Sequence, residues 1–99
     1  MYGTVARFRL KPGMEAAMLG LIQEFDLHPP AGYIGEYIYR MDEDPLNYFM
    51  VAVFESREAY FANADSAEQN ARYEKFRALL DADPQWHDGE IVAYPKRRL

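Results

Sequence analysis

Aromatic side chains at five positions have the types and the spacing that build a binding cleft. They are Tyr37 and Tyr39 on one face of a predicted strand, Tyr60 on a short predicted helix, Tyr73 on a longer one, and Trp86 at the start of the last predicted strand. A cleft lined by such rings, with a few polar tips, suits a planar aromatic ligand. Tyrosine is also a favoured strand residue that is often half-buried without a catalytic purpose, so a purely structural role stays open.

The histidines are the next candidates, because imidazole is the commonest general acid or base at neutral pH. His28 lies in a Pro-rich loop after a predicted helix, where it would either cap that helix or guard a pocket mouth. His87 stands beside Asp88, but neighbours on a strand point to opposite faces, so the start of a strand is the simpler interpretation. These two residues are far apart in sequence and neither belongs to an i, i+4 ligand pair, so no metal site is predicted.

Composition excludes several classes of function. The chain has 99 residues, no cysteine and a net charge of −5, which argues against thiol chemistry and against a nucleic-acid surface. The basic cluster in residues 96–99 is expected to be a solvated tail after a single domain formed by residues 1–95. No apolar run approaches the length of about 20 residues that spans a membrane, so we expect a cytoplasmic protein.

Periodicity predicts the elements that must position the aromatic residues. The first ten residues alternate as a strand, and Pro12-Gly13 ends it before a helix with an apolar stripe at Met14, Ala17, Met18, Leu21, Ile22 and Phe25. Strands follow over residues 33–41 and 48–54, separated by an acidic turn, and they form a hairpin. Ser56 is expected to cap a short helix over residues 57–63, and Ser66 with Gln69 forms a capping box for the next helix. Residues 86–93 are the last predicted strand.

The order strand, helix, strand, strand, helix, strand predicts a ferredoxin-like α+β fold, in which a four-stranded antiparallel sheet carries its helices on one face. Residues 49–54 are apolar throughout, although an antiparallel sheet that is open to water should alternate. The uncovered face is therefore expected to pair with a second copy of the chain, which gives a homodimer.

Three stretches in this order resemble the antibiotic biosynthesis monooxygenase family. They are residues 5–13, residues 35–40 leading to Asp44-Pro45, and residues 53–59, and the resemblance extends from Tyr2 to Val92. It implies a dimeric α/β barrel, with the two sheets facing each other and a pocket between sheet and helices in each subunit. The family includes cofactor-independent oxygenases of polycyclic aromatic substrates, haem-degrading enzymes, isomerases and members without an assigned reaction.

Some residues of this sequence depart from the family pattern. Related sequences often carry histidines where Asn63 and Glu68 stand here, and haem-degrading relatives carry an asparagine where Ala6 stands. No helix histidine matches the one that holds haem iron in those relatives. The resemblance therefore implies a reaction without haem, metal or another cofactor.

Two sets of site residues follow from these interpretations. The predicted pocket residues are Ala6, Phe8, Tyr37, Tyr39, Tyr60, Asn63, Tyr73 and Trp86, and the predicted dimer interface residues are Val5, Arg7, Glu36, Arg40, Val51 and Val53. The first hypothesis is a cofactor-independent monooxygenase that acts on an aromatic or polyketide-type substrate. The alternative is a non-catalytic dimeric ligand-binding or stress-associated barrel. A roomy pocket with an unsatisfied polar group would favour the first, and a pocket filled by its own aromatic rings would favour the second.

Overall fold

A computed structural model describes residues 1–94 of the chain. The predicted basic tail, residues 96–99, lies outside the described residues. The elements are β1 (Tyr2–Arg9), α1 (Glu15–Leu27), β2 (Tyr33–Arg40), β3 (Asn47–Phe54), α2 (Arg57–Ala64), α3 (Ala67–Arg77) and β4 (Gln85–Glu90). Their order confirms the predicted ferredoxin-like α+β fold.

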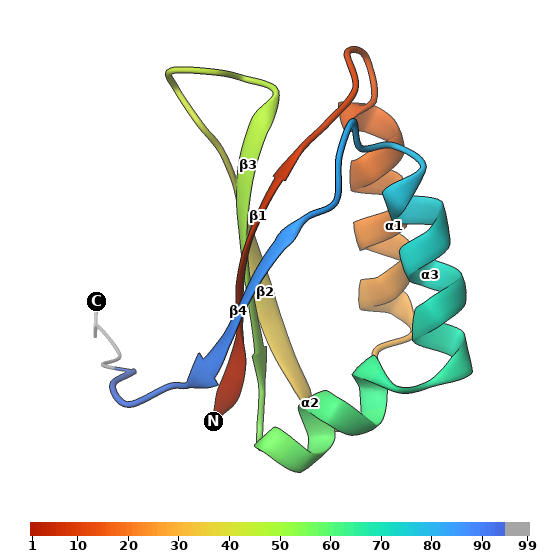
Figure 1. Cartoon of the computed structure of the whole chain (residues 1–99). Coiled ribbons are helices and arrows are strands. Elements are labelled where there is room, and N and C mark those ends of the chain that lie inside the picture. The colour runs from red at the N-terminus through yellow and green to blue at the C-terminus, as the bar shows by residue number, and fades with distance from the viewer. Residues whose placement is uncertain (95–99) are drawn as a thin grey trace.

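The four strands form one antiparallel sheet in the order β2-β3-β1-β4, with β2 and β4 at its edges. Helices α1 and α3 lie side by side over one face, which we call the inner face, and α2 lies at one end of the sheet (Figure 1). No element of residues 1–94 covers the opposite, outer face in this view (Figure 1).

Capping side chains begin the second and third helices as predicted. The hydroxyl of Ser56 accepts a hydrogen bond from the Ala59 N–H at 3.1 Å, and that of Ser66 accepts one from the Gln69 N–H at 3.1 Å. The reciprocal half of the predicted capping box is not formed, because the Ser66 N–H donates to the Asn63 carbonyl and the side chain of Gln69 accepts a bond from Arg72 instead. The two caps separate α2 from α3 and set the turn that brings α3 back over the sheet.

The last strand is shorter than the prediction. β4 ends at Glu90, where the sequence pattern predicts a strand to residue 93. Its partner β1 begins at Tyr2, and the Ile91 N–H finds its acceptor on Met1 at 2.9 Å. Beyond that point β1 offers no further backbone groups, so the ladder stops.

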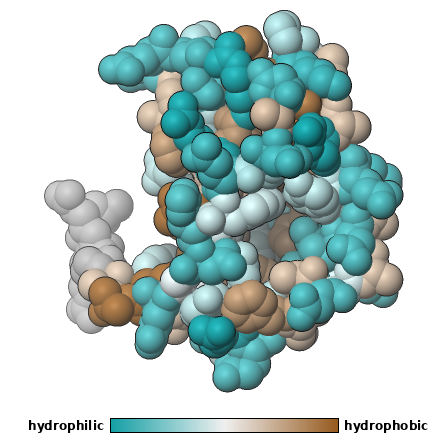
Figure 2. All heavy atoms as spheres, in the orientation of Figure 1, coloured by the Kyte–Doolittle hydropathy of each residue, from teal (hydrophilic) through white to brown (hydrophobic). Residues whose placement is uncertain are grey.

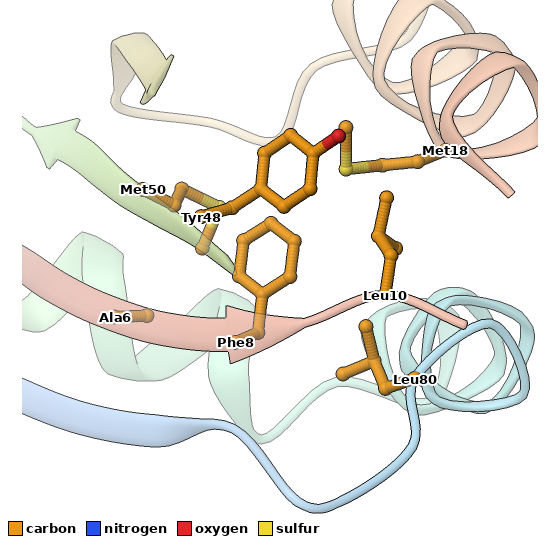
Figure 3. Close-up of a cluster of buried hydrophobic side chains, with 7 residues drawn as sticks. All are labelled: Ala6, Phe8, Leu10, Met18, Tyr48, Met50 and Leu80. Carbon is orange, nitrogen blue, oxygen red and sulfur yellow. The ribbon is translucent and has the colours of Figure 1, made fainter. Parts of the chain in front are cut away.

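The closed core lies at one end of the inner face. Its buried side chains are Ala6, Phe8, Leu10, Met18, Tyr48, Met50 and Leu80, and Figure 3 shows them converging from the sheet, α1 and the segment after α3. Phe8 and Tyr48 stack in parallel with ring centroids 5.4 Å apart. The Tyr48 hydroxyl donates to Glu15 at 2.9 Å, so the polar end of this buried side chain has a hydrogen-bond partner.

Candidate functional site

The inner face is hollow beside the closed core. A cavity of about 450 Å³ lies between the sheet and the α1–α3 layer, and Figure 2 shows a hollow in the middle of the surface that it views. Its lining residues are Thr4, Leu21, Ile22, Glu24, Phe25, Tyr33, Glu36, Met50, Ala52, Phe54, Tyr60, Ala64, Gln69, Asn70, Arg72, Tyr73, Lys75, Phe76, Trp86 and Asp88. Most of the wall is apolar or aromatic, with a few polar groups, which is the usual character of a small-molecule site.

A row of four residues crosses the sheet under this cavity, one from each strand. Glu36 on β2 lies opposite Ala52 on β3, Ala52 lies opposite Thr4 on β1, and Thr4 lies opposite Asp88 on β4. Residues directly opposite each other in antiparallel strands share a face, so all four point to the helices. Three of them are polar, and we call the set the polar row. Ala52 is small, which leaves open space above the middle of the row.

The ionisation of the Glu36 carboxyl is altered by its place in the cavity wall. Burial, with a smaller contribution from the negative charge of Asp26, raises the pKa of its carboxyl from 4.5 to about 7. Asp26 is held nearby by Tyr33, whose hydroxyl donates to it at 3.3 Å. A carboxylate with a pKa near neutrality can accept a proton from a bound ligand and release it again.

Tyr60 and Asp88 form a hydrogen-bonded pair at the opposite end of the polar row. The Tyr60 hydroxyl donates to the Asp88 Oδ1 at 2.7 Å. Burial, followed by this bond, raises the pKa of Tyr60 far above its ordinary value of 10. Tyr60 is therefore a neutral phenol at physiological pH, and it holds the Asp88 carboxylate against the cavity.

The hydroxyl of Thr4 makes no hydrogen bond of standard geometry within residues 1–94, although it lies near enough to the Tyr60 hydroxyl to lower the pKa of that phenol. Thr4 is 4% exposed, and in residues 1–94 its Oγ1 is the one buried side-chain polar atom that makes no hydrogen bond. A buried hydroxyl without a partner costs about 1–3 kcal/mol, so natural proteins rarely keep one unless something binds it. Thr4 lines the cavity, and a ligand there can reach it.

Arg72 lies on the α1–α3 side of the cavity. Its guanidinium carbon is 5.0 Å from the centroid of the Phe25 ring, and its Nη2 donates to the His28 carbonyl oxygen at 3.4 Å. It forms no ion pair with any residue from 1 to 94. A cation placed in this way draws acidic, anionic ligands toward the cavity.

The predicted pocket residues separate into four groups. Tyr60, Tyr73 and Trp86 line the cavity, whereas Ala6 and Phe8 belong to the closed core beside it. Asn63 lies on α2 and is not in the cavity wall, where its neighbour Ala64 takes part.

Tyr37 and Tyr39 do not line the cavity, and this part of the pocket prediction needs correction. They lie opposite Val51 and Phe49, on the outer face, and are 61% and 51% exposed. Both faces of β2 carry large side chains, so alternation separates its two faces without saying which one meets the helices.

The predicted interface residues also divide between the two faces of the sheet. Val5, Arg7, Val51 and Val53 lie on the outer face by their pairing. Glu36 and Arg40 are on the inner face: Glu36 lines the cavity, and the Arg40 Nη1 donates to Glu15 at 2.6 Å.

The histidines take no part in this cavity. His87 lies opposite Val5 on the outer face, whereas Asp88 faces inward, as strand alternation predicts. His28 caps α1, and its backbone N–H donates to the Phe25 carbonyl.

Within residues 1–94, no three side chains of the metal-binding kinds gather closely enough to hold an ion. No helix in the same range is long and apolar enough to cross a membrane.

Thr4, Glu36 and Asp88 are candidate site residues that the sequence interpretation did not assign to the pocket. One pattern points to Thr4, which is the polar position in the otherwise apolar series Tyr2, Ala6 and Phe8 of β1. Glu36 could have been found only by knowing that its strand face meets the helices.

The fold and the cavity define a class, a ferredoxin-like α+β domain with an aromatic-lined pocket between its sheet and helices. The model of the antibiotic biosynthesis monooxygenase family matches residues 1–79, and the chain belongs to this family.

Several solved structures share the fold. A protein from Bordetella bronchiseptica, named after the same family, is 20% identical with a TM-score of 0.77, and the match covers 93% of this chain and 97% of that one. A protein from Chloroflexus aurantiacus, named in the same way, is 21% identical with a TM-score of 0.76, covering 96% of each chain. A mutant of SnoaB, a cofactor-independent oxygenase from Streptomyces nogalater, is 14% identical with a TM-score of 0.77, covering 94% of each chain. A comparison with curated proteins finds no match.

Proposed function

We propose that this chain is a monooxygenase that acts on an aromatic or polyketide-type substrate without a metal or an organic cofactor. One observation carries the proposal: the Glu36 carboxyl, with a pKa of about 7, lines an aromatic-walled cavity of about 450 Å³. A base of this strength is suited to a phenolic or enolic substrate whose own acidity rises when it binds beside cationic Arg72.

The chemistry balances with dioxygen as the only co-reactant. Glu36 takes a proton from an activated methylene of the substrate, and the resulting enolate transfers electrons to dioxygen and forms a carbon–oxygen bond to it. The peroxide takes up a proton and then loses water, with cleavage of its O–O bond and loss of the second methylene hydrogen as a proton. The sum converts CH₂ and O₂ into C=O and H₂O, so one oxygen atom enters the product.

Membership of the monooxygenase family supports this class of reaction. SnoaB, which has the same fold, is named as a cofactor-independent oxygenase. The resemblance in fold permits many chemistries, so the proposal depends on the groups in the cavity of this chain.

The alternative is a non-catalytic ligand-binding or stress-associated barrel with a small or closed pocket. An open cavity and the unpartnered Thr4 hydroxyl favour the catalytic hypothesis. Tyr60, Tyr73 and Phe76 stand in the wall of the cavity and leave its space open.

Oxygen labelling tests the proposal. Anthrone, whose central methylene ionises readily, is incubated with the protein under ¹⁸O₂, and the rate without protein is subtracted. We expect anthraquinone with one ¹⁸O atom per turnover, and a rate at least about 100-fold lower for Glu36→Gln, the range of one general base. A Glu74→Gln variant changes an exposed carboxyl of α3 outside the cavity wall and is expected to keep the rate. Saturable binding without oxygen uptake across a panel of enolic substrates would favour the alternative.

We also propose that the outer face pairs with a second copy of the chain. Val5, Tyr37 and Tyr39 are 43%, 61% and 51% exposed there, and half-buried Phe49 and Val51 lie between them on the central strand β3. A contiguous apolar surface on a small domain is commonly covered by two-fold pairing.

A charged substitution at the centre of the outer face tests the dimer. Val51→Glu is expected to give a monomer or an aggregate, because it buries an unpaired charge in the interface. Leu19→Glu places the same charge on the exposed surface of α1 and is the control, since Leu19 is 53% exposed away from that face. Light scattering measures the mass, and a Val51→Glu protein with the wild-type dimer mass would contradict this interface.

A further inference from the structure

The polar row carries an inference about the shape and chemistry of the ligand. Because neighbouring strands lie about 4.8 Å apart, the Cα atoms of Glu36 and Thr4 are separated by about 10 Å, and those of Glu36 and Asp88 by about 14 Å. The middle position is Ala52, which leaves the space between the two ends free. The cavity thus has a polar group at each end and a flat, apolar middle.

The end opposite Glu36 has an unused donor beside a charged acceptor. Thr4 and Asp88 are direct neighbours on β1 and β4, where facing Cβ atoms lie about 5 Å apart. Asp88 Oδ1 already accepts the Tyr60 hydroxyl, and Thr4 Oγ1 has no partner in residues 1–94. A single oxygen atom placed between the two side chains can accept from the Thr4 hydroxyl and donate to the Asp88 carboxylate. A ligand hydroxyl does both, whereas a carbonyl or an ether oxygen can only accept.

We propose that Thr4 and Asp88, with Asp88 held by Tyr60, form a hydroxyl-binding subsite that selects fused-ring phenols carrying a second hydroxyl at the end remote from Glu36. The inference rests on the proposed function only in taking Glu36 as the reactive end. The ring system lies over Ala52, and its length of two or three fused rings matches the separation of the two polar ends.

Apolar and aromatic groups on both sides of the polar row fit such a ligand. The neighbouring row on one side includes Met50 and Trp86, and the row on the other includes Tyr33 and Phe54. All four side chains line the cavity. A planar ring system above Ala52 therefore meets apolar surface along its edges and finds polar partners only at its two ends, which sets its orientation.

Calorimetric binding of three naphthalene probes tests the subsite. The probes are 2-naphthol, 2,6-dihydroxynaphthalene, and 6-methoxy-2-naphthol, in which the second oxygen can no longer donate. Titrations under nitrogen keep the readout independent of turnover. For the wild-type protein we expect the diol to bind about threefold to tenfold more tightly than 2-naphthol, the range of one hydrogen bond, and the methoxy compound to lose this gain.

Two variants connect the gain to the subsite. Thr4→Val keeps the shape of the side chain and removes the hydroxyl, so the advantage of the diol should fall below about twofold, whereas Thr4→Ser should retain it. Asp88→Asn, at an exposed position, should reduce the advantage as well.

The proposal is overturned if the wild-type protein binds the diol and 2-naphthol equally well, or if the advantage of the diol survives in Thr4→Val and Asp88→Asn. Failure of the proposed function has a different signature. The diol then keeps its Thr4-dependent advantage in binding, while anthrone consumes no oxygen with the wild-type protein.

Discussion

Replacing Glu36 by glutamine should make the protein more stable at neutral pH. Most substitutions of a residue that stabilises the fold have the opposite effect. Burial raises the pKa of this carboxyl from 4.5 to about 7 in the folded protein. Below pH 4.5 it is protonated in both the folded and the unfolded chain, so it makes no pH-dependent contribution. Between pH 4.5 and 7 only the unfolded chain releases the proton, and stability falls as pH rises.

The size of the effect follows from the shift. Raising a pKa from 4.5 to about 7 corresponds to about 3 kcal/mol, which the partial exposure of Glu36 reduces to about 2 kcal/mol. Glutamine keeps the shape of the side chain and cannot ionise. The free energy of unfolding of Glu36→Gln should therefore be about 2 kcal/mol higher than that of the wild-type protein at pH 8, and the two should vary with pH in the same way below pH 4.5.

Urea unfolding at fixed protein concentration, repeated from pH 4 to pH 9, measures this difference. Glu15→Gln is the control with the opposite sign, because the hydroxyl of Tyr48 and the guanidinium of Arg40 lower the pKa of Glu15. Glu15 therefore stabilises the fold at neutral pH, and that contribution is lost as pH falls below its ordinary value of 4.5. A Glu36→Gln difference that does not change between pH 5 and pH 8 would show that burial does not raise the pKa of Glu36 in the folded protein.

Three further substitutions test the packing around the site. Gly3→Ala should lower stability by about 3 kcal/mol or more, because the added Cβ would lie 1.9 Å from the Ala52 carbonyl oxygen. The Cβ added by Gly35→Ala meets nothing within 4 Å, so this variant should lose less than about 1 kcal/mol. Equal melting temperatures of the two variants would contradict this difference. Tyr60→Phe removes the 2.7 Å hydrogen bond to Asp88. It should lower stability by only about 1 kcal/mol, or roughly 4–8 °C in melting temperature, because the exposed Asp88 carboxylate is then hydrated by water. A larger loss would show that the Tyr60 hydroxyl stabilises more of the structure than the Asp88 side chain.

The secondary structure could be predicted from the sequence because its cues are local. Ser56 and Ser66 cap their helices as their spacing indicates, and Pro12-Gly13 separates β1 from α1. On β1 the apolar residues of one face are interrupted only by Thr4, so its inner face was unambiguous.

The candidate site could be predicted only in part, because strand alternation assigns residues to two faces without naming the one that meets the helices. On β2 one face carries Tyr37 and Tyr39, and the other carries Glu36 and Ile38. The more aromatic face suggested a pocket, but the register places Tyr37 opposite Val51 and Glu36 opposite Ala52. That register depends on pairing between strands and on the irregularity between Tyr33 and Gly35, neither of which a single sequence specifies.

The pH dependence of kcat/KM for anthrone oxidation by the wild-type protein and by Glu36→Gln tests whether Glu36 is the base. With Glu36 as the base, kcat/KM of the wild-type protein should rise with pH, reach half its maximum near pH 7 and then level off, because the carboxylate form is the active one. The variant should lose this rise and be at least about 100-fold slower above pH 7. A Glu36→Gln protein that oxidises anthrone at the wild-type rate with the same pH profile would show that the Glu36 carboxylate does not begin the reaction.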